Sequence, residues 1–215
     1  FAEAIRSGRP SEVRFSPGIY FLKPEPDDGN ALCLTIEGAR DLLIEGSGAS
    51  FVIQSPDRGF LNIIRCTNVV ARHFSVDYDP LPFSQGIVTK IDDRSIEVKI
   101  AEGFPSLMEP RFASNSGSWG MLKDPQVPGR LKRGVYDWFA TRGISDLGNR
   151  LFRIEQKRSD FKPQVEVGDH YVQNGRRNAA KTFGTGLSES ITFEGIVIYS
   201  SPGASYVGWF GSLIN

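Results

Sequence analysis

The segment Ala39-Arg-Asp-Leu-Leu-Ile-Glu-Gly46 recurs as Thr67-Asn-Val-Val-Ala-Arg-His-Phe74 and again as Glu189-Ser-Ile-Thr-Phe-Glu-Gly-Ile196. Each copy places a short polar turn before a short apolar or β-branched run. The first two copies are 27 residues apart, counted from Asp41 to Asn68, and the third begins 122 residues after the second. Repeats of roughly 20–30 residues are typical of stacked β-structures. The spacing therefore predicts one turn of a solenoid, then one turn that carries roughly 95 additional residues.

Short apolar runs punctuated by glycine and proline surround these repeats, and they predict an all-β protein. The amphipathic start Phe1-Ala-Glu-Ala-Ile-Arg-Ser-Gly8 predicts a short helix that would cap the open end of a solenoid. We therefore expect a right-handed parallel β-helix with an inserted, mainly antiparallel domain that resembles a barrel or a sandwich. Residues 1–80 would form the N-terminal cap and first rungs, residues 81–187 the insert, and residues 188–215 the return to the β-helix. The chain would then stop within the solenoid.

The middle of the chain has a different pattern. Ile87–Ile91 and Ile96–Ile100 flank a polar connection and predict an antiparallel hairpin, whose second strand alternates strictly and so has one apolar face. Residues 81–187 carry 17 basic against 12 acidic side chains, whereas the whole chain carries 25 of each. The overall balance argues against a general nucleic-acid binder. We expect the basic segment to be an ordinary solvated surface.

Cofactors and membrane segments are not expected. Cys33 and Cys66 set no disulfide framework, and their apolar surroundings predict buried free thiols. Neither histidine has metal-ligand spacing to a second His or Cys, so no metal site is predicted. Structural calcium at Asp27-Asp28 or Asp92-Asp93 is an alternative to solvated turns. No apolar stretch has the length of a membrane span, and the missing initiator Met indicates an internal fragment.

Two further elements carry a family resemblance. Val13-Arg-Phe-Ser-Pro-Gly-Ile-Tyr20 resembles the first rung of the pectin-lyase-like right-handed parallel β-helix proteins. Phe74-Ser-Val-Asp-Tyr-Asp-Pro-Leu-Pro-Phe-Ser-Gln-Gly86 more specifically resembles the α-1,3-galactosidase family of β-helix glycoside hydrolases. In that family the chain leaves the β-helix after an Asp-aromatic-Asp element, forms a barrel and returns. The resemblance covers most of this chain and corresponds to the N-terminal part of the family.

The resemblance implies a secreted or periplasmic carbohydrate-active enzyme. Its partner would be a glycan substrate, with terminal α-galactosyl residues as one possibility, and the enzyme would hydrolyse glycosidic bonds. The family's catalytic carboxylates follow the insert, in Asp-Gly and Asp-Asp motifs. Residues 188–215 contain no such motif. The resemblance therefore implies that the catalytic residues lie after Asn215, and it assigns none within the chain.

Four residues are candidate substrate contacts. Asp77 and Asp79 alternate on one strand, so their carboxylates share a face roughly 6.6 Å apart, a spacing compatible with an inverting glycosidase pair. Aspartate also favours turns, and the alternative is that both cap the turn before Pro80. Tyr206 and Trp209 belong to an aromatic cluster. Such residues usually fill a core or an interface, but an outward position would let them contact a sugar ring.

Two other functions stay open at this stage. A polysaccharide lyase acting on an acidic glycan would need a Lys or Arg to neutralise the uronate, and the basic middle segment slightly favours it. A non-catalytic glycan-binding or adhesin solenoid belongs to a different class, because one fold hosts many functions.

Overall fold

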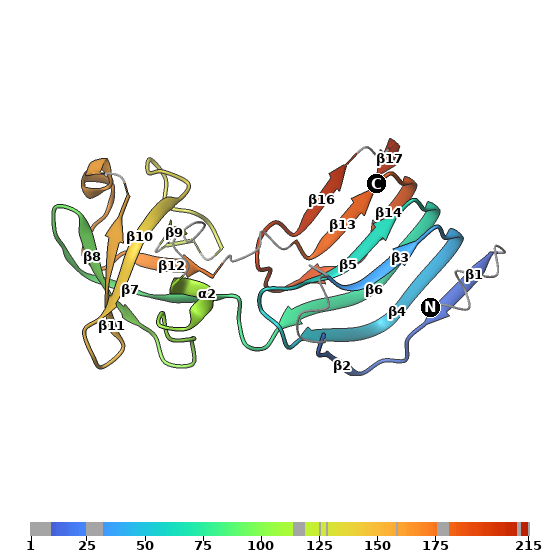
Figure 1. The fold of residues 1–215 in the computed structure, drawn as a ribbon, viewed down its shortest axis with the longest axis horizontal. Coiled ribbons are helices and arrows are strands. Elements are labelled where there is room, and N and C mark those ends of the chain that lie inside the picture. Colours follow the sequence, from blue (N-terminus) through green and yellow to red (C-terminus); the bar gives the residue numbers. More distant parts are fainter. Residues whose placement is uncertain are drawn as a thin grey trace. The chain divides into compact units, whose positions relative to one another are not determined.

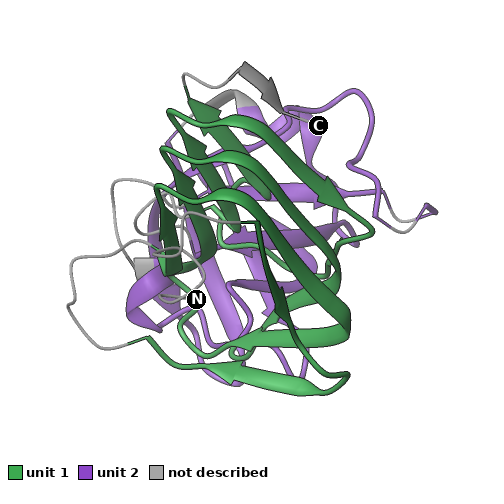
Figure 2. Ribbon diagram, turned by 90° about the vertical axis from the view of Figure 1, so that its right-hand side faces the viewer, with its two compact units in different colours: residues 1–80, 180–215 green, residues 81–179 purple. Residues whose placement is uncertain are grey.

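The computed structural model describes residues 10–24, 32–113, 119–124, 126–127, 129–157, 159–175, 181–209 and 212–214. The helix expected at residues 1–8 and the Asp27-Asp28 pair lie outside these ranges. The chain forms two compact units (Figure 2). Unit 1 comprises residues 1–80 and 180–215, and unit 2 comprises residues 81–179. Both units consist mainly of β-strands (Figure 1).

The larger sheet of unit 1 has seven strands, all paired in parallel. They are β1 (Ser11–Arg14), β2 (Ile19–Leu22), β4 (Arg40–Ile53), β6 (Thr67–Tyr78), β14 (Glu189–Glu194), β15 (Val197–Ile198) and β17 (Ser212–Ile214). The long strands β4 and β6 pair directly at the centre (Figure 1). β4 also pairs with β1 and β2, and β6 pairs with β14 and β15. β17 pairs with β14.

The smaller sheet of unit 1 has four parallel strands in the order β16-β13-β5-β3. They are β3 (Leu32–Glu37), β5 (Gly59–Ile64), β13 (Phe183–Gly186) and β16 (Tyr206–Trp209). β5 and β13 are far apart in sequence but adjacent in the sheet. Their register places Asn62 beside Gly184 and Ile64 beside Gly186. This sheet carries the aromatic residues that the sequence indicated as candidate contacts.

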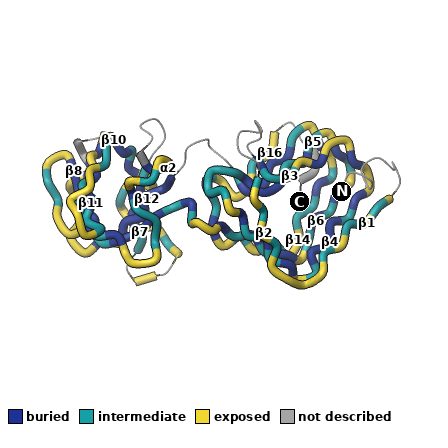
Figure 3. Tube along the Cα trace, turned by 60° about the horizontal axis from the view of Figure 1, so that its bottom comes forward, coloured by how far each residue is buried: buried dark blue, intermediate teal, exposed yellow. Residues whose placement is uncertain are grey.

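The two sheets of unit 1 share one apolar core. Phe51 of β4, Phe74 of β6 and Phe60 of β5 contact one another with ring centroids 5.0 to 5.8 Å apart. Because β5 belongs to the smaller sheet and the other two strands to the larger one, these rings join the sheets. Figure 3 shows buried segments on the strands of both sheets. Complete burial of one such side chain stabilises the fold by about 1.5–3 kcal/mol.

Left-handed backbone conformations recur along unit 1 at the spacing of the sequence repeats. They occur in three sets of corresponding positions, which are Gly38, Arg65 and Leu187; Asp41, Asn68 and Ser190; and His73 and Gly195. Neighbouring members of each set are 27 or 122 residues apart. The strands keep the same spacing, because Leu42 lies beside Val69 and Val69 beside Ile191. The repeat therefore sets the parallel register of β4, β6 and β14.

Unit 2 is a closed antiparallel barrel of six strands in the order β10-β11-β8-β7-β12-β9. The strands are β7 (Phe83–Ile91), β8 (Ser95–Ile100), β9 (Trp119–Lys123), β10 (Phe139–Asp146), β11 (Leu151–Gln156) and β12 (His170–Asn174). A short helix α2 (Pro110–Ala113) and a 3-10 helix η1 (Ser159–Gln164) accompany them. The predicted hairpin is confirmed as β7 and β8. The apolar face of β8 is buried in the barrel core, as its alternation predicted.

The fold class needs correction, although the all-β class is confirmed. In the described residues, unit 1 consists of two parallel sheets and unit 2 of a closed barrel, and no β-helix or solenoid is evident. The prediction of a right-handed parallel β-helix is therefore wrong. A repeat and its hydrophobic pattern determine which strands are neighbours and in what register. They do not determine how the sheets built from those strands close.

Candidate functional site

Asp77 lies at the end of β6, and Asp79 follows that strand. The half-buried Asp77 accepts hydrogen bonds at Oδ1 from Ser200 Oγ at 2.6 Å and from the Tyr78 backbone N–H at 2.8 Å. Ser200 follows β15, so this carboxylate connects the end of β6 to the segment after β15. Asp79 is exposed, and its backbone N–H donates to the carbonyl of Ile53 at 3.1 Å. In this arrangement Asp77 acts as a structural acceptor at the strand end.

Tyr206 lies on the same face of the smaller sheet as the buried Phe183, but 39% of its own surface is exposed. Its hydroxyl hydrogen-bonds with Thr185 Oγ1 at 2.8 Å, and its ring meets the Phe193 ring at a centroid distance of 5.5 Å. In the register of β13 and β16, Tyr206 lies beside the buried Phe183. The structure therefore gives Tyr206 packing partners in unit 1.

Trp209 projects from the opposite face of the same strand. Residues three apart on a strand point to opposite sides, so Trp209 and Tyr206 do not share a surface. The Trp209 side chain is half-exposed, and the Lys181 ammonium lies 3.3 Å from the centre of its ring. A cation at this distance over an indole makes a favourable electrostatic contact. We call this pair and its neighbours, Asn62, Gly184 and Gly186, the Lys181–Trp209 surface.

Glycines shape this surface. A Cβ atom at Gly184 would lie 2.5 Å from Lys181 Cε and 2.7 Å from Asn62 Oδ1, so the missing side chain lets Lys181 lie across the strand. A Cβ atom at Gly186 would meet nothing within 4 Å. Because Gly186 lies beside Trp209 in the register, open space adjoins the indole. Burial lowers the pKa of Lys181, so part of its ammonium is already shielded from water.

The sequence interpretation missed Lys181, Asn62 and the role of Gly184. The alternation in Phe183-Gly-Thr-Gly186 was the available signal, because two glycines on one face of a strand leave that face without side chains. The sequence does not show that Lys181 lies across this gap, because that contact depends on the conformation of the segment before β13. Asp77 lies in β6 of the larger sheet and Asp79 just after that strand, whereas Trp209 lies on an edge strand of the smaller sheet.

A second polar cluster surrounds Glu45. Its carboxylate accepts hydrogen bonds from the Ser47 N–H at 2.9 Å and from Arg72 Nε at 2.7 Å, and His73 Nδ1 lies at 3.2 Å. The Ser47 hydrogen bond, followed by Arg72 and His73, lowers the pKa of Glu45 to about 2. Such a carboxylate stays ionised under ordinary conditions and cannot donate a proton in catalysis. The cluster therefore joins β4 to β6.

Other candidates for ion binding are engaged within the protein. Lys90 pairs with Asp92 at 3.2 Å, and Lys162 pairs with Asp93 at 2.7 Å. Within the described ranges, no group of three or more His, Cys, Asp and Glu side chains is arranged to hold a metal ion. Cys66 is buried, Cys33 is partly buried, and both are free thiols. No helix in the described part of the chain is long and apolar enough to cross a membrane.

Comparison with known proteins relates part of this chain to a glycosidase. Alpha-1,3-galactosidase B of Bacteroides thetaiotaomicron is 30% identical over 104 residues. The match covers 45% of this chain but 17% of the length of that relative. No model of a known protein family matches the chain. The similarity supports a relationship to glycoside hydrolases at a distance, without identifying catalytic residues.

Proposed function

We propose that this chain is part of a glycoside hydrolase and that the Lys181–Trp209 surface contacts its glycan substrate. The similarity to alpha-1,3-galactosidase B supports the reaction class and makes terminal α-galactosyl residues the first substrate to test. One observation supports placing the glycan at this surface. The half-exposed Trp209 ring adjoins open space above Gly186, with an ammonium group and an amide close by.

The chemistry of this surface suits a sugar. An indole offers a large, rigid apolar face, against which the C–H groups of a pyranose ring pack, and it loses little conformational entropy on binding. The Lys181 ammonium donates hydrogen bonds, and the Asn62 amide both donates and accepts them. Sugar hydroxyls can pair with both groups. Because Lys181 is already partly desolvated, replacing its remaining water by a hydroxyl adds a small further cost.

We place the catalytic carboxylates of the whole protein outside this chain. Glycoside hydrolysis uses two carboxyl groups on either side of the scissile bond. Asp77 already accepts two hydrogen bonds at one oxygen, and Asp79 is exposed beside Pro80. The matched part covers only 17% of the relative, which leaves most of that enzyme without a counterpart here. We therefore assign a binding role to this chain.

The test uses the full-length protein that carries this chain and an oligosaccharide with a terminal α-1,3-linked galactose. We expect release of galactose without an unsaturated product. Trp209→Ala should lower kcat/KM by about three- to tenfold, since an aromatic contact contributes about 0.5–1.5 kcal/mol beyond its buried area. Trp138→Ala is the matched control, because Trp138 is a tryptophan of unit 2 with 56% of its surface exposed.

Two results would contradict this function. A product with a new ultraviolet-absorbing double bond would identify a lyase acting on an acidic glycan. An equal effect of Trp209→Ala and Trp138→Ala would remove the Lys181–Trp209 surface from the binding site.

A further inference from the structure

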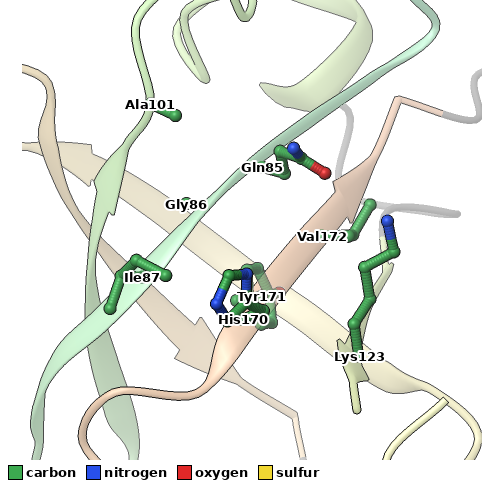
Figure 4. Close-up of a pocket in the computed structure, with 8 residues that line it drawn as sticks. All are labelled: Gln85, Gly86, Ile87, Ala101, Lys123, His170, Tyr171 and Val172. Carbon is green, nitrogen blue, oxygen red and sulfur yellow. The ribbon is translucent and has the colours of Figure 1, made fainter. Parts of the chain in front are cut away.

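A hollow of about 120 Å³ opens on the barrel of unit 2 (Figure 4). Gln85 and Ile87 of β7, Lys123 of β9, and His170 and Val172 of β12 line it, together with Gly86, Ala101 and Tyr171. The register places Val172 beside Gln85, and His170 beside both Ile87 and Lys123. Cross-strand neighbours in an antiparallel sheet project from the same face. These side chains therefore form one continuous patch across three strands.

The hollow depends on small residues in β7 and beside it. A Cβ atom at Gly86 would overlap the backbone carbonyl of Lys99, so glycine is needed where β7 approaches β8 this closely. Ala101 donates its backbone N–H to the Gln85 carbonyl at 3.0 Å and presents only a methyl group to the space. The hollow is large enough to hold several water molecules. It has room for the charged end of a ligand and not for an oligosaccharide.

Lys123 differs from the other lysines of the barrel. Lys90 and Lys162 pair with aspartates, Lys132 pairs with Asp169, and Lys99 donates to a backbone carbonyl. Lys157 is likewise engaged in a contact with another group of the protein. In the part of unit 2 that the structure describes, Lys123 is the one lysine whose ammonium has no hydrogen bond or ion pair. A cation left unpaired among so many paired ones is available to a ligand.

Two polar groups near Lys123 are also available to a ligand. Neither the Gln85 amide nor the His170 imidazole has a side-chain hydrogen bond to any described residue. In Figure 4 the Gln85 amide oxygen and the Lys123 ammonium are both directed toward Val172, and His170 is turned toward Ile87. The hollow thus combines a positive charge and an amide with an apolar floor.

Two acidic residues that adjoin lining residues in sequence are already paired with other cations. Asp124, which follows Lys123, pairs with Arg130. Asp169, which precedes His170, accepts hydrogen bonds from Lys132 Nζ at 2.9 Å and from the Glu166 N–H at 2.8 Å. Lys132 also pairs with Glu166 at 3.1 Å. Residues 81–179 contain 16 basic against 12 acidic side chains. The surroundings therefore favour an anionic ligand over a cationic one.

We propose that the barrel hollow binds the carboxylate of an acidic sugar. Lys123 pairs with the carboxylate, the Gln85 amide donates to it or to an adjacent hydroxyl, and Val172 contacts the carbon face of the ring. The choice of a sugar as the carrier of the charge rests on the proposed glycan function. The site recognises an acidic residue of the glycan, separately from the sugar at the Lys181–Trp209 surface.

The experiment is a titration of the ¹⁵N-labelled protein followed by NMR, with galacturonate, galactose and inorganic sulfate as separate probes. Galacturonate should shift the amide signals of β7, β9 and β12 and bind at least about tenfold more tightly than galactose, the range for a charge-assisted hydrogen bond. Lys123→Gln should weaken galacturonate binding by a similar factor. Gln85→Ala should weaken it less. Lys90→Gln is the control, because Lys90 is an exposed barrel lysine already paired with Asp92 and Glu97.

Equal binding of galactose and galacturonate, or equal effects of Lys123→Gln and Lys90→Gln, would overturn the proposal. If sulfate binds as tightly as galacturonate does, the site recognises negative charge alone, and the assignment to a sugar is overturned. Galactose release by the full-length protein is measured separately. Hydrolysis without galacturonate binding would reject this site and leave the proposed function standing.

Discussion

Asn68 Nδ2 donates a hydrogen bond to Asp41 Oδ1 at 2.6 Å, and both residues have left-handed backbone conformations, with φ of 55° and 50°. The two side chains thus join β4 to β6 at the point where each strand begins. Asparagine and aspartate tolerate this conformation better than other residues with a side chain. The same position in β14 is occupied by Ser190, with φ of 56°. The left-handed backbone conformation at the start of each strand therefore explains why each repeat has a polar residue there.

Asn68→Val should destabilise the protein because of this left-handed conformation. A β-branched residue in the left-handed region is strained by about 1–3 kcal/mol, and the hydrogen bond to Asp41 is lost as well. Asn68→Gly keeps the conformation and loses only the hydrogen bond, which contributes about 0.5–1.5 kcal/mol. Urea denaturation should rank the proteins as wild type, Asn68→Gly and then Asn68→Val. Equal stability of the two variants would show that the left-handed conformation carries no strain.

The Glu45 cluster predicts an acid-sensitive contribution to stability. The hydrogen bonds from Ser47, Arg72 and His73 lower the pKa of Glu45 from 4.5 to about 2. A group whose pKa is lowered on folding stabilises the folded state above its unfolded pKa, and this stabilisation is lost as the pH falls through the folded value. The contribution should therefore be complete above about pH 4.5 and disappear toward pH 2.

Glu45→Gln isolates this contribution from the other carboxylates. At neutral pH the variant should be less stable than the wild type, and the difference should shrink between pH 4.5 and 2, because protonated glutamate resembles glutamine. Denaturation curves at several pH values give the difference directly. A difference that stays constant over this range would show that the charge of Glu45 does not stabilise the fold.

The pair Gly184 and Gly186 provides a matched test of the Lys181–Trp209 surface. Gly184→Ala introduces a methyl group 2.5 Å from Lys181 Cε and 2.7 Å from Asn62 Oδ1, so the lysine must leave its place over the indole. Gly186→Ala meets nothing within 4 Å. Trp209 fluorescence, isolated by replacing Trp119 and Trp138 with phenylalanine, should shift to longer wavelength in Gly184→Ala as the ring becomes more exposed. Identical spectra for the two variants would mean that Lys181 does not cover the ring.

Much of the strand arrangement of unit 1 could be predicted from sequence, because its determinants are local. The polar positions Asp41, Asn68 and Ser190 recur at the spacing at which the strands pair, and apolar residues follow each of them. The β7–β8 hairpin was predictable for the same reason, since alternation and a polar connection are adjacent in the chain. Closure of the sheets depends on contacts such as Phe51 with Phe60, which no short segment encodes.

The candidate site was less accessible to sequence reasoning. Alternation shows that Tyr206 and Trp209 face opposite sides of a strand but does not show which side is buried. The structure answers this through Thr185 and Phe193, which contact Tyr206 on the core side. The position of Lys181 over Trp209 and the unpaired state of Lys123 depend on side-chain conformations and on the whole set of neighbouring charges. Neither follows from residue spacing.

Gly120 and Gly143 test the packing of the barrel core. A Cβ atom at Gly120 would overlap the hydroxyl and ring of Tyr171, which is 1% exposed and donates to Gln173 Oε1 at 2.7 Å. The buried ring has no free space, so Gly120→Ala must displace it and disturb its hydrogen bond. Overpacking a core in this way costs about 1–3 kcal/mol. Gly143→Ala, also in a barrel strand, would meet only the Glu155 side chain at 3.9 Å.

We therefore expect Gly120→Ala to lower the urea midpoint of unit 2 and Gly143→Ala to leave it nearly unchanged. Trp119 and Trp138 both belong to unit 2, so their fluorescence follows this transition when Trp209 is replaced by phenylalanine. Amide exchange in β9 and β12 should accelerate in Gly120→Ala, because β9 carries Gly120 and β12 carries the displaced Tyr171 ring. A midpoint for Gly120→Ala equal to that of Gly143→Ala would show that the barrel interior can absorb a methyl group, and that Tyr171 is less tightly held than its burial indicates.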